Sequence, residues 1–108
     1  MPAKFIIIMV TAPSKKEADK IVAELIKNKL IACGNILGNI DSVFLWKSKI
    51  EKAKEVLLIL KTRADLFDEV AALVAKAHSY EVPEIIALPI VRGAKKYMKW
   101  LDTSVKKQ

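Results

Sequence analysis

Residues 30–62, LIACGNILGNIDSVFLWKSKIEKAKEVLLILKT, decide the fold that we expect for this chain. Apolar runs lie toward both ends of this stretch, and the polar segment KSK at 47–49 separates them. Two apolar runs on either side of a polar turn are typical of neighbouring strands that pair as a hairpin. Glycine and asparagine between positions 34 and 39 indicate a bulge or bend in the first strand. The stretch therefore predicts one long, irregular β-hairpin, with its second strand at 54–62.

A strand and a helix are predicted ahead of this hairpin. Residues 5–10, FIIIMV, are apolar and rich in β-branched side chains, as in a strand that is buried on both faces. Ser14 is followed three residues later by Glu17, which is the spacing of a capping box at a helix start. The helix should end near Asn28, and its apolar stripe consists of Ala18, Ile21, Val22, Leu25 and Ile26.

A helix, a strand and a last helix are predicted after the hairpin. The first of these helices should begin near residues 62–63 and end at His78. A strand follows at 83–91, and Pro89 inside it lacks the N–H of a central strand, which places this strand at a sheet edge. Gly93 ends the strand, and the last helix should direct four side chains inward: Tyr97, Met98, Leu101 and Val105.

The order of these elements is β-α-β-β-α-β with an added C-terminal helix. This order is the pattern of an α+β, ferredoxin-like sandwich. Right-handed crossovers place the first and third strands at the centre of the sheet and the fourth at an edge, which agrees with the proline argument. A chain of 108 residues fits one domain, so we expect residues 1–108 to form a single unit.

The polarity of the central strands does not suit an isolated subunit of this fold. An antiparallel sheet with helices on one face normally alternates apolar and polar residues, because its other face meets water. Both central strands are instead continuously apolar, and the hairpin tip carries Phe44, Leu45 and Trp46 beyond the reach of two helices. We therefore expect a homo-oligomer in which neighbouring chains cover the open face.

Charge and composition bear on the partners. The net charge is +7, but it comes from 17 lysines and only two arginines that are spread along the chain among acidic residues. Nucleic-acid surfaces favour arginine and stacking aromatic side chains, and the two central strands lack such a platform. The longest apolar run, 5–10, is far below the roughly 20 residues that a membrane-spanning helix needs. We expect neither a nucleic acid nor a membrane as partner.

Cysteine usage bears on the cellular compartment. Cys33 is the single cysteine of the chain and cannot form an intrachain disulfide. Disulfides are rare where thiols are kept reduced, so this composition indicates a cytoplasmic protein.

Two residues are candidate metal ligands. Cys33 and His78 offer a thiolate and an imidazole, which suit copper or zinc. The alternative is structural: Cys33 as a small apolar filler of a strand, and His78 as a helix end that meets the last carbonyl groups. One chain offers fewer ligands than the four of a usual structural zinc site, so a metal site would lie between subunits or be weak. No cofactor is required in this interpretation.

A second kind of site is a cleft between subunits. Trp46, Tyr80 and Glu84 could line such a cleft, and Lys61 could hold a small anionic metabolite there. The alternative for the aromatic side chains is core or interface packing. No nucleophile has an adjacent base and a third orienting group in the sequence, so we expect no enzymatic activity.

The chain resembles the divalent-cation-tolerance, or CutA, family along most of its length. The similar motifs occur in order across about residues 5–103: TAPS at 11–14, LIACGNI at 30–36, FLWKSKIEKAKEVLLILKT at 44–62, HSYEVPEII at 78–86 and YMKW at 97–100. The resemblance implies a ferredoxin-like subunit in a homotrimer whose architecture is similar to that of PII signalling proteins.

The resemblance also bears on function. Family members are linked to tolerance of divalent metals and some to copper binding, which implies a metal response with Cys33 and His78 as ligands. The chain departs from the family pattern at Ser79, Ser48 and Val10, and the last replaces a cysteine of some copper-linked members. We therefore expect the chain to bind copper or another divalent ion weakly or not at all. The alternative is a PII-like module that senses a small anionic metabolite.

Overall fold

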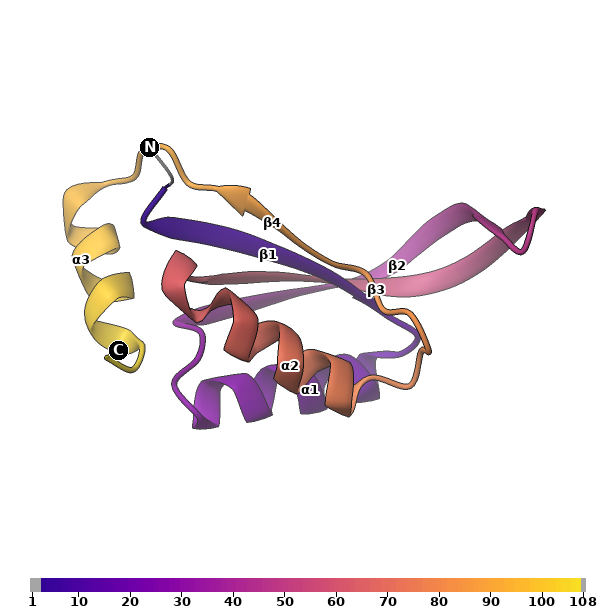
Figure 1. Cartoon of the computed structure of the whole chain (residues 1–108), viewed down its shortest axis with the longest axis horizontal. Helices are drawn as coiled ribbons and strands as arrows, with labels where there is room; N and C mark the ends of the chain where they lie inside the picture. Colours follow the sequence, from indigo (N-terminus) through magenta and orange to yellow (C-terminus); the bar gives the residue numbers. More distant parts are fainter. Residues whose placement is uncertain (1–2, 108) are drawn as a thin grey trace.

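Strands and helices follow one another along the chain in the predicted order. The structure, a computed structural model, describes residues 3–107. Its elements are β1 (Phe5–Ala12), α1 (Lys15–Lys27), β2 (Cys33–Trp46), β3 (Lys49–Arg63), the short 3₁₀ helix η1 (Ala64–Leu66), α2 (Phe67–Ala77), β4 (Ile85–Pro89) and α3 (Lys95–Ser104) (Figure 1). In the described residues no helix is long and apolar enough to cross a membrane.

The four strands form one antiparallel sheet in the order β2-β3-β1-β4. β1 and β3 are therefore central and β4 lies at an edge, as the proline argument predicted. Helices α1 and α2 lie on one face of this sheet, whereas α3 lies beyond one end of the strands (Figure 1). The α+β, ferredoxin-like architecture with an added C-terminal helix is confirmed.

The core lies between the sheet and the two helices. Along β1, Ile6, Ile8 and Val10 are buried, whereas Ile7 and Met9 are only partly buried. The alternation arises because successive side chains of a strand point to opposite faces. The buried set packs with apolar side chains of both helices, which include Ile21, Leu25, Val70 and Val74. Ser14 begins α1 as predicted, since its Oγ accepts the N–H of Glu17 at 3.2 Å.

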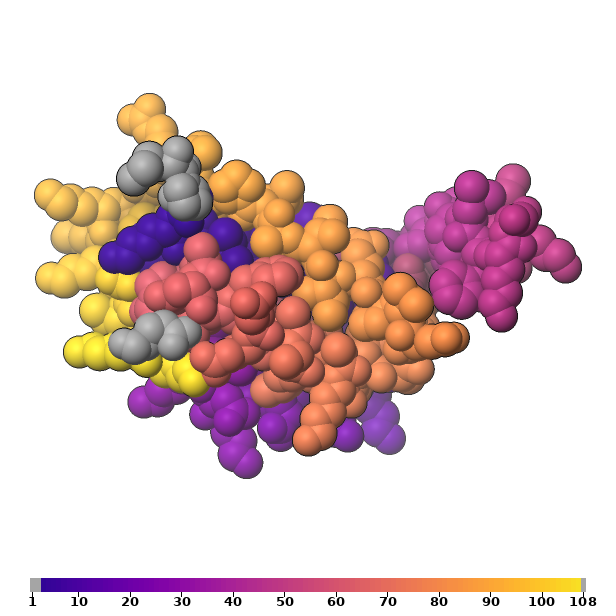
Figure 2. All heavy atoms as spheres, viewed as in Figure 1, coloured from indigo at the N-terminus to yellow at the C-terminus, as the bar shows by residue number. Residues whose placement is uncertain are grey.

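The long hairpin has the predicted irregularity. Its register shifts between Leu37 and Ile40, where Asn39 adopts a positive φ of 60°. The turn consists of Lys47 and Ser48, both with positive φ (51° and 65°). Positive φ at both central residues of a two-residue hairpin loop is the arrangement that matches the twist of the flanking strands. The hairpin arm extends well beyond the body of the subunit (Figures 1 and 2).

Several predicted boundaries are wrong because pairing in the sheet overrides local pattern. β2 begins at Cys33 rather than at Leu30, whose carbonyl oxygen instead accepts the hydroxyl of Thr62 at 2.6 Å. β3 begins at Lys49, and its pairing with Phe5 of β1 holds it in strand conformation to its last residue. This delays α2 to Phe67, after η1. β4 is shorter than predicted and spans Ile85–Pro89 only.

The last helix is only partly oriented as predicted. Leu101 and Val105 are buried and Met98 is partly buried, but Tyr97 is 41% exposed and stacks beside Trp100 with ring centroids 5.4 Å apart. The expectation that Tyr97 points inward is wrong, because α3 packs against the end of the sheet and buries a narrower stripe than a helix lying across a sheet face (Figure 1).

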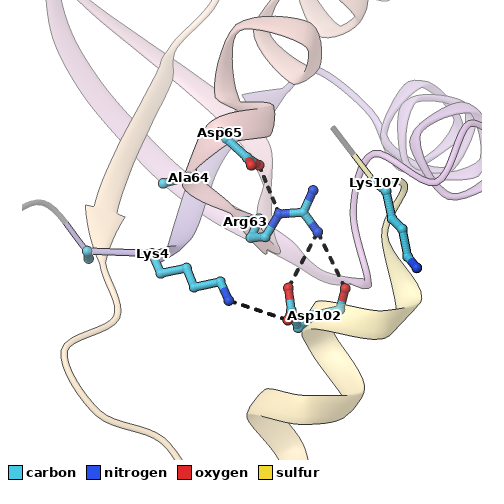
Figure 3. A pocket seen from close by; sticks show the side chains of 7 residues that line it. Lys4, Arg63, Ala64, Asp65, Asp102 and Lys107 are labelled. Atoms are coloured by element: carbon cyan, nitrogen blue, oxygen red, sulfur yellow. Dashed lines mark hydrogen bonds and ion pairs between the residues drawn. The ribbon is translucent and has the colours of Figure 1, made fainter.

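An arginine of β3 fastens α3 to the sheet. The buried Arg63 donates from Nε to Asp65 at 2.9 Å, approaches Asp102 Oδ1 with Nη1 at 3.4 Å, and donates from Nη2 to the carbonyl oxygen of Lys106 at 2.7 Å. Figure 3 shows the contacts of Arg63 with Asp65 and Asp102, and Lys4 reaching Asp102 from the start of the chain. Charge-assisted bonds to a buried guanidinium are stronger than neutral ones. Charged side chains that pair with one another therefore line much of the pocket drawn in Figure 3.

Helix α1 approaches β2 closely at Gly34. A Cβ at this position would lie 2.8 Å from Cγ1 of Val22, whereas a Cβ at Gly38 would meet no atom within 4 Å. We expect Gly34→Ala to lower the free energy of unfolding by about 1–3 kcal/mol, because it forces α1 away from the sheet. Gly38→Ala is the matched control and should change it by less than about 0.5 kcal/mol. Urea denaturation of both variants checks this, and equal midpoints would contradict it.

Candidate functional site

His78 caps the end of α2 and is held inside the molecule. Its N–H donates to the carbonyl oxygen of Val74 at 2.9 Å, and its side chain is fully buried (0% exposed). Nδ1 accepts the N–H of Tyr80 at 3.0 Å, and Nε2 lies 2.7 Å from the carbonyl oxygen of Thr11. Since Nδ1 accepts, Nε2 must carry the proton and donate it to Thr11. Both ring nitrogens are thus engaged by the backbone.

Glu17 joins the start of α1 to the segment after α2. Its Oε2 accepts both the N–H and the hydroxyl of Ser79, each at 3.1 Å, and lies 3.4 Å from Nδ1 of His78. In a full capping box this carboxylate would return to the N–H of Ser14. It is directed instead to residue 79, a contact across 62 positions that the sequence pattern did not reveal.

Tyr80 and Glu55 form a second contact between distant parts of the chain. The Tyr80 hydroxyl donates to Oε2 of Glu55 at 2.8 Å, and Glu55 is only 6% exposed. Burial, followed by the hydrogen bond and charge of Glu55 and the charge of Glu17, raises the pKa of Tyr80 to about 12. The phenol therefore stays protonated and acts as a donor. The prediction named Tyr80 but missed Glu55, which no local motif marks.

These contacts place residues 80–84 beside the hairpin arm, and a groove lies between them. We call it the hairpin groove: one part, of about 460 Å³, is lined by Phe44, Trp46, Glu55, Tyr80, Val82 and Glu84 among others. An adjoining part of about 400 Å³ adds Glu51 and Glu81. In Figure 2 the magenta hairpin tip projects from the body, and the orange segment beside it includes residues 80–84, which line the other side of the groove. Three of the predicted cleft residues, Trp46, Tyr80 and Glu84, thus meet in one groove.

Lys61, the fourth predicted cleft residue, lies elsewhere. Its Nζ donates to Oδ1 of Asn35 at 2.8 Å, on the sheet face opposite the helices, where it is the pairing partner of Cys33. The groove has Glu55 and Glu84 in its place, and no lysine or arginine lines either part of it among the described residues. The arrangement is unsuited to an anion, so the geometry does not favour a sensor of anionic metabolites.

The two candidate metal ligands are separated within one chain. Cys33 is partly exposed at the start of β2, and its Sγ lies 3.9 Å from Oδ1 of Asn35. Its partner in β3 is Lys61, whereas Thr11, which binds His78, is opposite Leu57. Four residues of strand separate these pairs by roughly 13 Å. Within residues 3–107 no group of three or more His, Cys, Asp or Glu side chains could hold a metal ion.

The fit of each residue to a soft metal ion follows from these contacts. The thiol of Cys33 is accessible and suits copper. His78 does not fit, because a metal bond would require one buried ring nitrogen to give up its backbone partner.

Relatives and solved structures share the fold closely. The crystal structure of CutA1 from Oryza sativa has a TM-score of 0.95 and 40% identity, and the match covers 99% of this chain and 98% of that chain. The periplasmic divalent cation tolerance protein CutA from Archaeoglobus fulgidus has a TM-score of 0.92 and 45% identity, with 94% and 99% covered. At such identities the likeness extends beyond the fold to the family.

Two curated relatives match at similar levels but differ in length. The divalent-cation tolerance protein CutA of Archaeoglobus fulgidus is 47% identical over 98 residues, which are 91% of this chain and 95% of that protein. The chloroplastic protein CutA 1 of Oryza sativa is 43% identical over 101 residues, or 94% of this chain. The chain spans only 57% of the rice protein's length.

The prediction of a cytoplasmic location is wrong as an inference from cysteine usage. The rice and Arabidopsis relatives are named chloroplastic, and the Archaeoglobus structure is described as periplasmic. A chain with one cysteine lacks an intrachain disulfide in any compartment, so this composition does not distinguish among them.

The motifs that resembled a known family are matched along the chain by a family model. The model is described as CutA1 divalent ion tolerance protein, and it covers residues 6–104. This range includes every residue of the hairpin groove and both candidate metal ligands. The chain belongs to the CutA1 divalent ion tolerance protein family.

Proposed function

We propose that this chain acts as a homotrimer in the response to divalent metal ions. The observation that carries the proposal is the family match over residues 6–104, together with relatives that are named for divalent-cation tolerance. An enzymatic activity is not part of the proposal. The hydrogen bond from Tyr80 to Glu55 fastens two segments, and neither residue is set beside a nucleophile in the described contacts.

The face of the sheet opposite the helices supports the homotrimer. Ile7 and Met9 of β1 are only partly buried, and Ile86 and Leu88, their partners in β4, are exposed on the same face. Leu37 of β2 adds to this surface. A contiguous apolar face of this kind is unusual on a monomer and marks an interface. We expect further copies of the chain to cover this apolar face, because most soluble oligomers are closed symmetric assemblies of one chain.

The apolar tip of the hairpin gives a second reason. Val43, Leu45 and Ile50 are all exposed. They belong to the hairpin arm, which extends beyond α1, α2 and α3 (Figure 1). An exposed apolar strand pair projecting from a subunit is an aggregation hazard unless a partner buries it. Arms that lie on neighbouring subunits would remove this hazard.

Light scattering tests the assembly. The native protein should have three times the 12.1 kDa mass of one chain. Leu88→Glu places a charge in the proposed interface and should give a smaller species, because a buried unpaired carboxylate is costly. Ile26→Glu is the matched control: Ile26 is 43% exposed on α1, Leu88 is 48% exposed on β4, and the trimer should persist. A native protein that remains a soluble monomer would refute the trimer.

The metal response is proposed to involve a weak site between subunits with Cys33 as its main ligand. Cys33 lies at the start of the edge strand β2, on the face that neighbouring copies would cover. Assembly repeats each ligand and so supplies what one chain lacks. His78, named with Cys33 as a ligand from the sequence, could take part only after releasing Thr11 or Tyr80. Copper or another soft divalent ion is the proposed ligand.

Copper titration of the assembled protein tests these assignments. We expect Cys33→Ser to weaken copper binding at least about tenfold, because the thiolate is the softest ligand available. His78→Gln should change the affinity less than about twofold. Competition against a copper chelator of known affinity measures both. An unchanged affinity in a Cys33→Ser and His78→Ala double variant would show that neither residue binds the metal.

Denaturation measures how much the side chain of His78 contributes to the free energy of unfolding. His78→Ala removes the partners of the Thr11 carbonyl and the Tyr80 N–H, and we expect it to lower the free energy of unfolding by about 2–4 kcal/mol. Ser79→Ala removes only an exposed hydroxyl contact to Glu17 and should lower it by less than about 1 kcal/mol. Equal losses in the two variants would contradict a structural histidine.

A further inference from the structure

The hairpin groove has a charge opposite to that of the whole chain. Four carboxylates line its two parts, Glu51, Glu55, Glu81 and Glu84, although the chain carries a net charge of +7. No ion pair joins any of these four to a lysine or arginine among the described residues. Uncompensated like charges in a concave surface attract cations from solution.

The walls of the same groove are aromatic. Phe44 and Trp46 come from the hairpin arm, and Tyr80 comes from the segment after α2. The faces of such rings attract organic cations, and tryptophan does so best. The chain itself displays this attraction, because Nζ of Lys47 lies 5.9 Å from the centroid of the Trp46 ring. Lys47 does not line the groove, but its ammonium group lies over the Trp46 ring. Because a bound organic cation would interact with the same ring, Lys47 is an intrinsic competitor.

Glu55 supplies a buried acceptor at the groove. Its Oε2 accepts the Tyr80 hydroxyl, and this is the only hydrogen bond of its carboxylate in the described residues. No buried side-chain oxygen is without a partner in the described residues, so Oε1 is open to solvent at one of the two hollows that Glu55 lines, the hairpin groove and the hollow beside Lys15 and Lys54. A carboxylate oxygen in this position gains most from a ligand that donates an N–H bond.

These features select an amine over a metal ion. Inorganic ions need several carboxylate or imidazole ligands that converge, and no such group occurs within residues 3–107. Aromatic rings offer no ligand to magnesium or calcium, but they favour the alkyl chain and the ammonium groups of an amine. A quaternary ammonium ion has no N–H for Glu55, and a single ammonium group would leave most of the four carboxylates uncompensated.

We propose that the hairpin groove binds a linear polyamine, with its alkyl chain against Trp46 and its ammonium groups beside Glu55 and the outer carboxylates, Glu51, Glu81 and Glu84. The two parts of the groove, about 460 Å³ and 400 Å³, accommodate such a chain. This binding is separate from the proposed metal response, since neither Cys33 nor His78 lines the groove. It holds whether or not copper binds.

Spermidine titration of the native assembly, freed of metal by a chelator that is then removed and with ionic strength held constant, tests the proposal. A Trp100→Phe background leaves Trp46 as the only tryptophan, so its fluorescence reports the groove. We expect a saturable change with spermidine, a weaker one with n-butylammonium, and the weakest with tetramethylammonium. Magnesium chloride and sodium acetate should give none. No saturable response to spermidine, or an equal response to magnesium, would overturn the proposal.

Variants followed by calorimetry separate the groove from the general surface. Trp46→Leu should weaken spermidine binding about three- to tenfold, and Lys47→Met should tighten it about two- to fivefold by removing the intrinsic competitor. Trp100→Leu is the matched control, because Trp100 is 45% exposed and Trp46 is 40% exposed. It should leave the affinity unchanged.

The outer carboxylates have a matched control of their own. Glu81→Gln and Glu51→Gln should each weaken spermidine binding, whereas Glu24→Gln on the exposed face of α1 should not. If the Glu24 and Trp100 controls lose as much affinity as the groove variants, binding is a property of the whole surface and the proposal fails. A copper affinity that stays the same in the groove variants would keep the two sites distinct.

Discussion

The pairing of β1 with β3 is the constraint on which the rest of the structure depends. With Ile8 opposite Leu60, one set of aliphatic side chains faces the helices and closes the core. The alternate set, which includes Ile7 and Met9, faces the other way and is also apolar. A hydrophobic pattern that is alike on both faces does not select a register by itself. The bond from Thr62 to the Leu30 carbonyl ties the chosen register to the end of the loop after α1.

That sheet also positions the groove through a chain of buried contacts. Thr11 at the end of β1 accepts from His78, which in turn receives the N–H of Tyr80. Tyr80 then reaches back to Glu55 on β3, so the segment after α2 is closed onto the two central strands. Glu17 fastens the same segment to α1. His78, which looks like a metal ligand in the sequence, here connects β1 to the segment that forms one side of the groove.

The charges of the molecule are distributed unevenly, and this bears on its ligands. Lysines are spread along the chain and give it a net charge of +7, yet the hairpin groove gathers carboxylates and aromatic rings. Cys33 lies away from the groove, on the sheet face that the proposed assembly covers. We thus propose soft-metal binding and organic-cation binding at different surfaces of one subunit. Each surface has the chemistry that suits its ligand, softness at the thiol and π faces with carboxylates at the groove.

The sequence by itself determined the order of elements, the bulge near Asn39, the turn after Trp46 and the edge position of β4, because each depends on neighbours a few residues apart. The family could be recognised for the same reason, since its motifs are contiguous. Only the tertiary structure decided that His78 is buried, that Lys61 lies away from Tyr80, and that Glu55 closes the groove. Those outcomes join residues 25 to 67 positions apart, and strand register and helix packing, which local patterns do not encode, bring them together.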